Sequence, residues 1–413
     1  MNCIIVTIGD ELLIGQVVNT NAAYIAQKLN NVGIGVVRTI TVGDDEKDIL
    51  NAISEGLRQA DVTIATGGLG PTHDDITKRA ICSYFHVDLI LNRDALEDVR
   101  DWLKRRSASL TKAAEEQALI PRNASIIHNR LGTAPGLLIE QDGRYFIAMP
   151  GVPYEMEKMV DDHIVPYLRE KSSGNVILHR TLNTTGIPES LLAEQIGDPR
   201  LLPEGTRLAF LPSPNGVRLR ITVNVNEHAA AHQKINEVET RIRSKVQKYI
   251  YGIDGETLEE VIGKLLLAQH LSMAVAESCT GGLISHRITN VSGSSQYFDR
   301  CVVAYSNRTK IENLNLSAEI LETYGAVSKE VAEAMASGIR SLSHADIGIS
   351  TTGIAGPTGG SAEKPVGLVW VGYSAENETF SQKFQFGPDR LRIKERAAQA
   401  ALDLLRRKLL KLS

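Results

Sequence analysis

The first 85 residues alternate short apolar runs with amphipathic helical patterns, and the alternation repeats at intervals of roughly 30 residues. Strands that alternate with helices in this way are typical of βαβ units, which build a parallel sheet with helices on its faces. The predicted strands are 3–8, 34–42 and 62–66, and the predicted helices are 22–29, 48–57 and 72–84. The pattern predicts that the chain begins with an open α/β domain.

A polar turn follows each of these predicted strands. The turns are Gly9-Asp10-Glu11, Gly43-Asp44-Asp45 and Gly67-Gly68-Leu69-Gly70-Pro71-Thr72. In an open α/β sheet such turns emerge at the carboxyl edge of the strands, where ligands bind. The third turn is neither a Walker loop nor a dinucleotide fingerprint, but its glycines let the backbone approach an anion before a helix begins. We therefore predict a phosphate site with Gly67, Gly68, Gly70 and Thr72 as contacts.

Acidic residues accompany this predicted phosphate site. Asp74 and Asp75 follow the glycine turn, and Asp44 follows the neighbouring strand. Carboxylates beside a phosphate repel it unless a divalent cation lies between them, which favours a metal-assisted site. Mg²⁺, Mn²⁺ and Co²⁺ suit aspartates nearly equally, so the metal stays open. The structural alternative is that Asp74 and Asp75 are ordinary acidic residues in the first turn of a helix.

Two further loops have the composition of ligand-edge loops. Gly132 and Thr133 precede an apolar strand predicted at 137–139, and Gly151 follows a strand predicted at 145–148. We predict these three residues as ligand contacts. For the second loop a structural explanation is also available, since Pro153 stands where prolines commonly begin a helix.

The segment 174–253 has a βαββα order that resembles a KH-type module. The predicted strands are 181–185, 207–211 and 217–225, and the predicted helices are 189–197 and 229–247. The turn Pro212-Ser213-Pro214-Asn215-Gly216 favours a hairpin between the last two strands. The GXXG clamp that KH modules use for RNA is absent, and Thr185-Gly186-Ile187-Pro188-Glu189 does not replace it. We therefore predict a small α+β connector or dimerisation domain.

A candidate nucleophile lies in Ala276-Glu277-Ser278-Cys279-Thr280-Gly281-Gly282, between a strand predicted at 273–276 and a helix predicted at 283–288. At such a strand-to-helix turn a hydroxyl can point into a cleft, while backbone N–H groups at the helix start face a developing negative charge. This arrangement suits hydrolysis of an amide or ester. We predict Ser278 as the nucleophile, with Thr280, Gly281 and Gly282 around the substrate.

A serine needs a base, and the segment Tyr305-Ser306-Asn307-Arg308-Thr309-Lys310 supplies candidates. A lysine desolvated in a cleft is a base near neutrality, and a tyrosine hydroxyl can relay or orient the proton. We predict Lys310 as the base and Tyr305 as its partner. No histidine is close in sequence, which argues against a Ser-His-Asp triad unless His286 or His344 approaches in space. The alternative is a tight glycine turn beside a solvated lysine.

Cys279 is the rival nucleophile, because a helix N-terminus can lower the pKa of a thiol. We favour Ser278, since adjacent residues at a turn point in different directions and a small buried cysteine is commonly structural. The two single alanine variants distinguish these assignments.

The C-terminal motifs resemble the amidase domain of the CinA family. The resemblance rests on AESCTGG, SGSSQYFDRCVVAYSNRTK and TGIAGPTGG, and it extends from residue 258 to the C-terminus. It implies an α/β amidase domain over 258–413 that hydrolyses nicotinamide mononucleotide to nicotinate mononucleotide and ammonia without a cofactor. The implied catalytic set is Ser278, Tyr305 and Lys310, with Thr352 and Gly353 lining the nucleotide pocket and Arg390 binding the phosphate. A structural role at a helix start after Pro388 explains Arg390 equally well.

The N-terminal motifs resemble the molybdopterin-binding domain that opens CinA-family proteins. The resemblance rests on Gly9-Asp10-Glu11, Asn19-Thr20-Asn21, the segment 66–72 and Asp74-Asp75. It implies a parallel-sheet domain over 1–170 that splits ADP-ribose into AMP and ribose 5-phosphate with a divalent metal held by Asp44 and Asp75. Glu11, Asn19 and Asn21 would orient the sugar or the water. Related domains of molybdenum-cofactor proteins bind a pterin instead, and this alternative stays open.

Composition fits a multidomain enzyme. A chain of 413 residues is long enough for several domains, and its net charge of −4 without a basic stripe gives no support for a nucleic-acid partner. The four cysteines have no CxxC pair, which is typical of a reducing compartment, and no apolar run approaches the roughly 20 residues that span a bilayer. We therefore expect a cytoplasmic protein without a membrane partner and, by default, a homodimer.

We expect both reactions to serve pyridine-nucleotide salvage. The main alternative is a non-catalytic protein that binds a nucleotide or a pterin and is linked to competence or to the response to DNA damage. The presence of Ser278, Tyr305 and Lys310 together favours catalysis in the C-terminal half.

Overall fold

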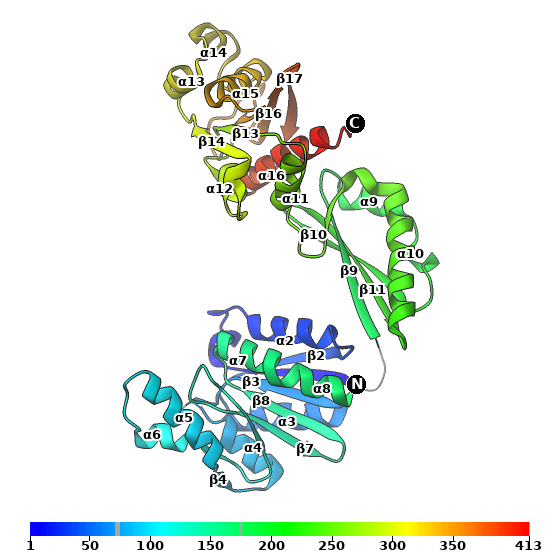
Figure 1. Cartoon of the computed structure of the whole chain (residues 1–413), viewed down its shortest axis with the longest axis vertical. Coiled ribbons are helices and arrows are strands. Elements are labelled where there is room, and N and C mark those ends of the chain that lie inside the picture. The colour runs from blue at the N-terminus through cyan, green and yellow to red at the C-terminus, as the bar shows by residue number, and fades with distance from the viewer. Residues whose placement is uncertain (71–74, 173–175, 413) are drawn as a thin grey trace. The chain divides into compact units, whose positions relative to one another are not determined.

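The computed structural model describes residues 1–70, 75–172 and 176–412 (Figure 1). The chain divides into two compact units, Met1–Leu178 with Val223–Lys234, and His179–Thr222 with Ile235–Ser413. Within the described ranges no helix is both long and apolar enough to cross a membrane.

The first unit contains a six-stranded sheet with the order β2-β1-β3-β8-β7-β6. Four of its strands are parallel, namely β1 (Asn2–Ile8), β2 (Gly35–Val42), β3 (Val62–Thr66) and β8 (Arg144–Met149). The three strands predicted from the first 85 residues are thereby confirmed as parallel neighbours. β7 (Gly136–Gln141) and β6 (Ser125–Ile127) extend the sheet in antiparallel pairing.

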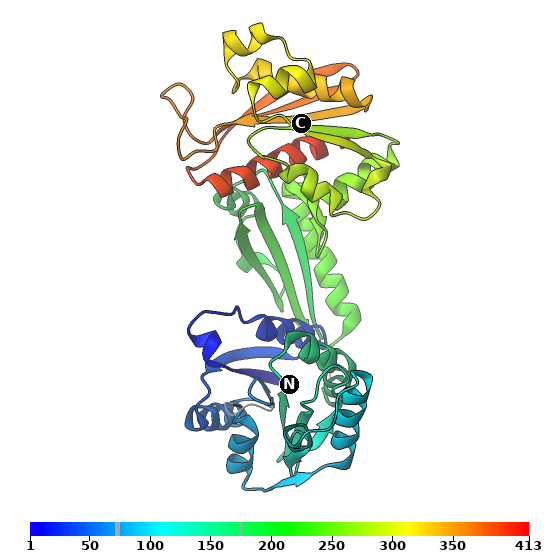
Figure 2. The ribbon, with the colours of Figure 1, turned by 90° about the vertical axis from the view of Figure 1, so that its left-hand side faces the viewer.

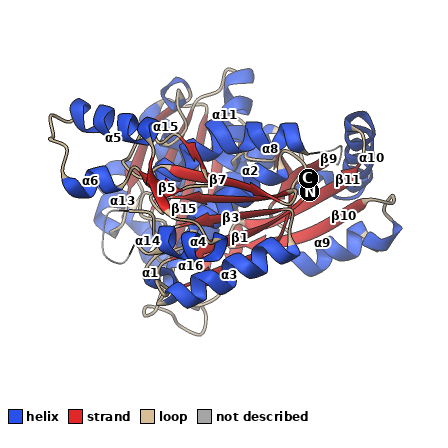
Figure 3. Ribbon diagram, turned by 90° about the horizontal axis from the view of Figure 1, so that it is seen from below, coloured by secondary structure: helices blue, strands red, loops and turns tan. Residues whose placement is uncertain are grey.

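Both faces of this sheet are covered by helices, as Figures 1 and 3 show. Alternate residues of β1 point to opposite faces, so that Ile4 and Val6 join one core while Cys3 and Ile5 join the other. The first core includes α3 (Glu46–Gln59) and α4 (Thr77–Phe85), and the second includes α2 (Thr20–Asn30), α7 (Pro153–Met159) and α8 (Val165–Lys171). Two buried faces explain why β1 and β3 are largely apolar, whereas the edge strand β2 is partly exposed.

Several elements of the first unit do not appear in the sequence prediction. They are the short α1 (Asp10–Leu13), the pair β4 (Leu89–Leu91) and β5 (Leu119–Pro121), the helices α5 (Arg93–Arg105) and α6 (Lys112–Glu116), and the π-helical turn Val160–Ile164 that joins α7 to α8. The helix predicted from residue 72 begins at Thr77 instead, and residues 71–74 lie outside the described ranges.

The connector confirms the predicted βαββα order and adds one strand. Its elements are β9 (Val176–Thr184), α9 (Glu189–Ile196), β10 (Thr206–Ser213), β11 (Gly216–Val225), α10 (His228–Val246) and β12 (Ile250–Ile253). Short 3-10 turns occur at Pro199–Leu201 and Gln247–Tyr249. The sheet order is β10-β11-β9-β12, so the predicted hairpin is formed by β10 and β11.

The C-terminal domain has a five-stranded sheet with the order β14-β13-β15-β16-β17. β13 (Met273–Glu277) lies between β14 (Phe298–Val303) and β15 (Ile347–Gly353) and is parallel to both. β16 (Leu368–Ala375) and β17 (Glu378–Gln385) complete the sheet in antiparallel pairing. This order makes β13 an interior strand with a parallel neighbour on each side.

Helices cover both faces of this sheet as well. One core contains Val275 of β13 with α11 (Leu258–Ala268), α12 (Leu283–Thr289) and α16 (Arg390–Leu409), the red helix of Figure 2. The other core contains Ala276 with α14 (Ala318–Tyr324), α15 (Lys329–Ser343) and the last residue of α13 (Asn307–Leu314).

Within the second unit, α16 joins the connector to the C-terminal domain. Gln399 donates to Thr185 Oγ1 at 3.1 Å, and the fully buried Arg406 donates to the Lys248 carbonyl at 2.8 Å while pairing with Asp403. Gly186 has a φ of 75°, and a Cβ there would lie 2.9 Å from Asp403 Oδ2. The loop that stands where a KH module places its RNA-binding turn is therefore packed on α16.

Candidate functional site

Three parallel strands end side by side at one edge of the C-terminal sheet. In the strand register Glu277 of β13 pairs with Val303 of β14 and with Thr351 of β15. Ser278 therefore follows the end of β13 directly, while Tyr305 lies two residues beyond the end of β14. Because neighbouring strands are about 4.8 Å apart, the segments after these ends form one site.

Ser278 and Lys310 are in direct contact, as the sequence predicts. Lys310 lies in α13, is 2% exposed, and its Nζ is 3.3 Å from Ser278 Oγ and 2.9 Å from the Ala304 carbonyl. Burial lowers the pKa of the Lys310 ammonium below its ordinary value, since the charged form loses its hydration. A lysine held in this way is suited to take the proton of the serine hydroxyl.

Tyr305 does not join this contact. Its ring is 62% exposed, and its hydroxyl accepts a hydrogen bond from Arg390 Nη2 at 3.0 Å. Arg390 also donates to the Gly356 carbonyl at 2.7 Å, which ties the start of α16 to the loop after β15. The structure thus brings Tyr305 together with Arg390 rather than with Ser278 or Lys310, because the residue lies in the exposed link between β14 and α13.

The start of α12 is already occupied by a carboxylate. The fully buried Glu277 accepts from the backbone N–H groups of Gly282 and Ser285, both at 2.9 Å, and from Ile284 at 3.2 Å. The expectation that these helix-start N–H groups face the substrate is therefore wrong. Gly281 and Gly282 have φ values of 60° and 92°, so their role is to form the turn.

Two other backbone donors follow the serine. Within the described residues, the N–H groups of Cys279 and Thr280 donate to no backbone carbonyl, and the Cys279 N–H contacts its own thiol. The Thr280 hydroxyl itself is buried against Thr351 Oγ1 at 2.7 Å, so only the backbone of Thr280 is available. The N–H of the residue after a nucleophilic serine is a common oxyanion donor at this type of turn.

Cys279 has the properties of a structural residue. It is 6% exposed, and burial raises the pKa of its thiol to about 12, which leaves almost no thiolate at neutral pH. His286 forms a hydrogen bond with Asn290, and His344 is the C-cap residue of α15. Ser278 therefore has no histidine partner among the described contacts.

The remaining predicted residues of this half have mainly structural contacts. Thr352 is 1% exposed and donates to the Ala326 carbonyl at 2.6 Å, and a Cβ on Gly353 would lie 2.7 Å from the Leu368 carbonyl. Lys394, which the sequence analysis missed, lies on α16 with its Nζ 3.5 Å from a Cβ built on Gly281. Lys394 lies four residues after Arg390, and this spacing places two side chains on the same face of a helix. The spacing was the sequence signal that could have indicated Lys394.

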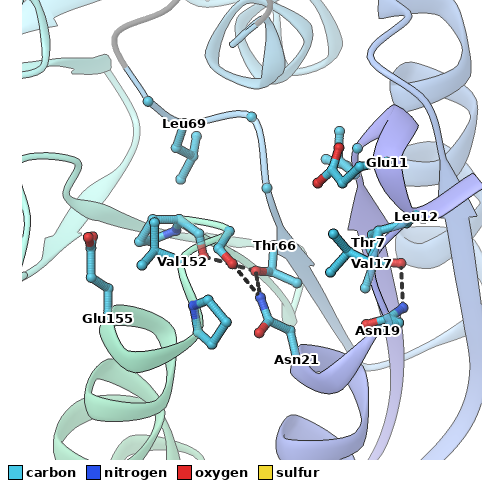
Figure 4. Close-up of a pocket in the computed structure, with 18 of the residues that line it drawn as sticks. Thr7, Glu11, Leu12, Val17, Asn19, Asn21, Thr66, Leu69, Val152 and Glu155 are labelled. Atoms are coloured by element: carbon cyan, nitrogen blue, oxygen red, sulfur yellow. Dashed lines mark hydrogen bonds between the residues drawn. The ribbon is translucent and has the colours of Figure 1, made fainter. Parts of the chain in front are cut away.

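The first unit contains a cavity of about 540 Å³ at the carboxyl edge of β1, β3 and β8 (Figure 4). Its lining includes most of the residues predicted for this half, namely Glu11, Asn19, Asn21, Asp44, Gly67, Gly68, Gly70, Asp75, Thr133 and Gly151. Gly132 does not line it, and Thr72 and Asp74 lie outside the described residues. The antiparallel pairing of β7 with β8 brings the loop containing Thr133 to this edge.

Two asparagines fix the floor of this cavity. Asn19 caps α2 and donates to Thr7 Oγ1 at 3.0 Å, and Asn21 donates to the Gly151 carbonyl at 2.8 Å. The Asn21 Oδ1 atom is buried and has no hydrogen-bond partner within the described residues. Since a buried acceptor without a partner is unfavourable, this atom is suited to accept a hydrogen bond from a ligand.

The glycine turn forms the wall predicted to bind phosphate. Gly67 has a φ of 117°, and a Cβ there would lie 2.1 Å from the Ile8 carbonyl, so only glycine fits. Asp75 accepts from the Gly70 N–H at 2.8 Å and thereby holds the turn. The backbone N–H groups of Gly68 and Leu69 have no acceptor within the described residues, which leaves them available for an anion.

Carboxylates also line this cavity. Asp44 and Asp75 line the cavity with Glu11, and Asp44 Oδ2 accepts from the Asp10 N–H at 3.1 Å. Among the described residues no three His, Cys, Asp or Glu side chains converge as a metal site. Two carboxylates are nevertheless enough for Mg²⁺, which commonly binds one or two of them together with substrate phosphates and water. The residues present therefore fit a cation that binds with a phosphate ligand.

Glu155 of α7 also lines this cavity, and the sequence analysis missed it. It is 7% exposed and accepts from Asn129 Nδ2 at 2.7 Å. Figure 4 shows Glu155 and Glu11 on opposite sides of the cavity.

Each of the three parts of the chain matches a known family. Residues 4–170 match the probable molybdopterin binding domain, residues 179–252 the damage-inducible protein CinA KH domain, and residues 255–409 the CinA C-terminal domain. A Caldicellulosiruptor saccharolyticus protein named for competence and damage induction is 47% identical over 98% of this chain and 98% of its own length. A CinA-like protein of Kosmotoga olearia is 42% identical over 100% of both chains. The chain belongs to the CinA family.

A crystal structure of CinA from Thermoplasma acidophilum is 38% identical to this chain in sequence, with a TM-score of 0.37. The match covers 39% of this chain and 94% of that protein. Membership in the CinA family confirms the resemblance drawn from the sequence motifs. The three family matches also confirm the architecture of a molybdopterin-binding-like domain, a KH-like connector and a CinA C-terminal domain. The name of the Caldicellulosiruptor saccharolyticus relative refers to competence and damage, that of the Kosmotoga olearia relative only to CinA, and neither specifies a substrate.

Proposed function

We propose that the C-terminal domain hydrolyses the carboxamide of nicotinamide mononucleotide to a carboxylate and ammonia. The observation that carries the proposal is the buried amine of Lys310, 3.3 Å from the Ser278 hydroxyl. A desolvated lysine beside a serine at the end of a central strand supports nucleophilic attack on an amide carbon.

In the proposed reaction the neutral Lys310 amine takes the Ser278 proton as Oγ attacks the amide carbon. The carbonyl electrons move to oxygen, and the backbone N–H groups of Cys279 and Thr280 stabilise that oxyanion. The Lys310 ammonium then gives its proton to the amide nitrogen, the C–N bond breaks and ammonia leaves. A water molecule, deprotonated by Lys310, attacks the acyl carbon, and the serine leaves with the proton returned.

We assign the substrate phosphate to the start of α16. Arg390 and Lys394 are one helical turn apart. Arg390 lies near the Gly356 carbonyl, and Lys394 lies near Gly281. Tyr305 is hydrogen-bonded to Arg390, so we assign it to substrate binding with that arginine rather than to proton transfer. Arg390→Ala should then raise KM more than it lowers kcat.

The first test is ammonia release from nicotinamide mononucleotide by the purified full chain without added metal. We expect activity in the wild type and in Cys279→Ala, and only background release in Ser278→Ala. An active serine variant beside an inactive cysteine variant would overturn the assigned nucleophile. The absence of ammonia release from a folded wild type would overturn the proposed activity.

A second activity is favoured by the cavity of the first unit. It combines free backbone donors at Gly68 and Leu69, the unpartnered Asn21 Oδ1 and the carboxylates of Asp44 and Asp75. This combination supports metal-dependent cleavage of ADP-ribose into AMP and ribose 5-phosphate. Asp44 and Asp75 would hold the divalent cation, which would neutralise charge on the pyrophosphate when bound.

The second activity is tested with ADP-ribose in Mg²⁺, Mn²⁺ or Co²⁺ and in EDTA. We expect cleavage that EDTA abolishes and that Asp44→Asn reduces by at least about tenfold. Asp45→Asn is the matched control, because Asp45 caps α3 without lining the cavity and asparagine caps equally well. Binding of a pterin without cleavage of ADP-ribose would favour the alternative.

A further inference from the structure

A second cavity of about 510 Å³ lies wholly within the second unit. It is lined by the loop 185–189 and the hairpin turn 212–217 of the connector, together with β17 and α16 of the C-terminal domain. The size is in the range of about 300–1,000 Å³ that small-molecule sites occupy. None of its lining residues belongs to the two sites described above.

One wall of this cavity is aromatic. Phe384 and Phe386 lie two residues apart around the end of β17, and their rings are nearly parallel at 7° with centroids 5.8 Å apart. Both rings are half-buried against the core and line the cavity. Pro212 and Pro214 of the hairpin also line the cavity. A flat ring is the ligand shape that such a wall favours.

The α16 wall is polar and carries excess positive charge. Arg396, Gln399, Asp403 and Arg407 recur at helical spacing and all line the cavity. Asp403 is neutralised by Arg406, whose Nη2 is 2.8 Å from Asp403 Oδ1. Asp403 Oδ2 also lies 3.0 Å from Arg407 Nε. Arg396 is exposed and has no partner among the described ion pairs, whereas Arg407 is paired with Asp403.

We propose that this cavity binds a mononucleotide, with the base against Phe384 and Phe386 and the phosphate at Arg396. Guanidinium groups pair closely with phosphate oxygens, and the Glu189 carboxylate and Gln382 amide at the rim can accept from the exocyclic N–H groups of a base. A ligand in this cavity contacts both the connector and the C-terminal domain, so it stabilises the contact between them.

The test uses the full chain and AMP as the probe. Hydrogen exchange resolves the binding location, which separates this cavity from the one in the first unit. We expect AMP to protect the amides of 213–217 and 396–407. Arg396→Glu should need about tenfold more AMP for the same protection, since the change removes a phosphate contact and adds a repulsive charge. Arg392→Glu is the matched control, because it changes the same charge on the same helix outside the cavity.

Two ligand fragments test the chemical class. Ribose 5-phosphate lacks the ring and adenosine lacks the phosphate, so each should protect these segments less than AMP does at equal concentration. Equal protection by ribose 5-phosphate would show that the aromatic wall contributes nothing and would overturn the assigned class. Protection confined to residues 1–178, or equal weakening by Arg392→Glu and Arg396→Glu, would overturn the site.

Discussion

Replacing Lys310 tests the catalytic reasoning most directly. Lys310→Arg keeps a positive charge beside Ser278 but cannot lose its proton near neutrality, and Lys310→Met keeps the apolar stem without an amine. Loss of a general base typically costs a factor of about 10²–10⁴ in rate, which is ~2.7–5.5 kcal/mol of transition-state stabilisation. Because Nζ is the only described base in contact with the Ser278 hydroxyl, we expect both variants to lose at least about 100-fold in kcat/KM.

The pH dependence of the wild type supplies the second readout. Burial lowers the pKa of Lys310, so the neutral base accumulates below the ordinary lysine value of 10.5. Ammonia release should therefore rise with pH through the lowered pKa and level off above it. A rate that rises only around 10.5, or a Lys310→Arg variant with the wild-type rate, would refute the role of Lys310 as the base.

The same shift predicts a change in stability. Between the lowered pKa and 10.5 the unfolded chain binds a proton at Lys310 that the folded chain does not, so the folding free energy becomes more favourable as pH rises through this window. The slope is at most ~1.4 kcal/mol per pH unit and is absent in Lys310→Met. Denaturant unfolding followed by Trp370 fluorescence in a Trp102→Phe background should show this difference. Parallel pH profiles for the two proteins would contradict it.

Three further predictions concern the scaffold, and each is measured by denaturant unfolding of the part concerned. Glu277→Gln should cost roughly 3 kcal/mol and slow ammonia release, because an amide turns donors toward the N–H groups at the start of α12. Gly67→Ala should cost at least about 3 kcal/mol, whereas Gly143→Ala, where φ is also positive at 74° but the space around it is open, should cost only about 1 kcal/mol. Asp403→Ala should cost about 3–5 kcal/mol because it leaves a buried arginine unpaired, whereas Glu312→Ala removes an exposed pair and should change stability by less than about 1 kcal/mol.

The repeating part of the fold could be read from the sequence because its physical signals are local. Strands buried on both faces are continuous apolar runs, and the strand predicted at 62–66 agrees with Val62–Thr66 in the structure. The pair β4 and β5 was missed because each strand has only three residues, too few to show a period. The antiparallel direction of β7 was also missed, since strand direction depends on pairing that no local pattern encodes.

The candidate site was only partly predictable for a similar reason. Residue type and position after a strand were enough to pair Ser278 with Lys310, because both belong to one edge of one sheet. They were not enough to show that Glu277 occupies the start of α12, or that Tyr305 faces Arg390, since these depend on side-chain direction. The homodimer and the absence of a nucleic-acid partner stay predictions.

The start of α16 shows how charge on a helix can indicate function. Arg390, Arg392, Lys394 and Arg396 lie within its first two turns, and no acidic residue lies in its first turn. Cations in the first turn of a helix oppose its dipole at about 0.3–1 kcal/mol each, so Arg390 and Arg392 are unfavourable for the isolated helix, while the N-cap Asp389 opposes this effect. Arg390 and Lys394 lie at the edge that carries Ser278, and Arg396 lines the second cavity. In the two sites proposed above, a bound anion would offset this cost.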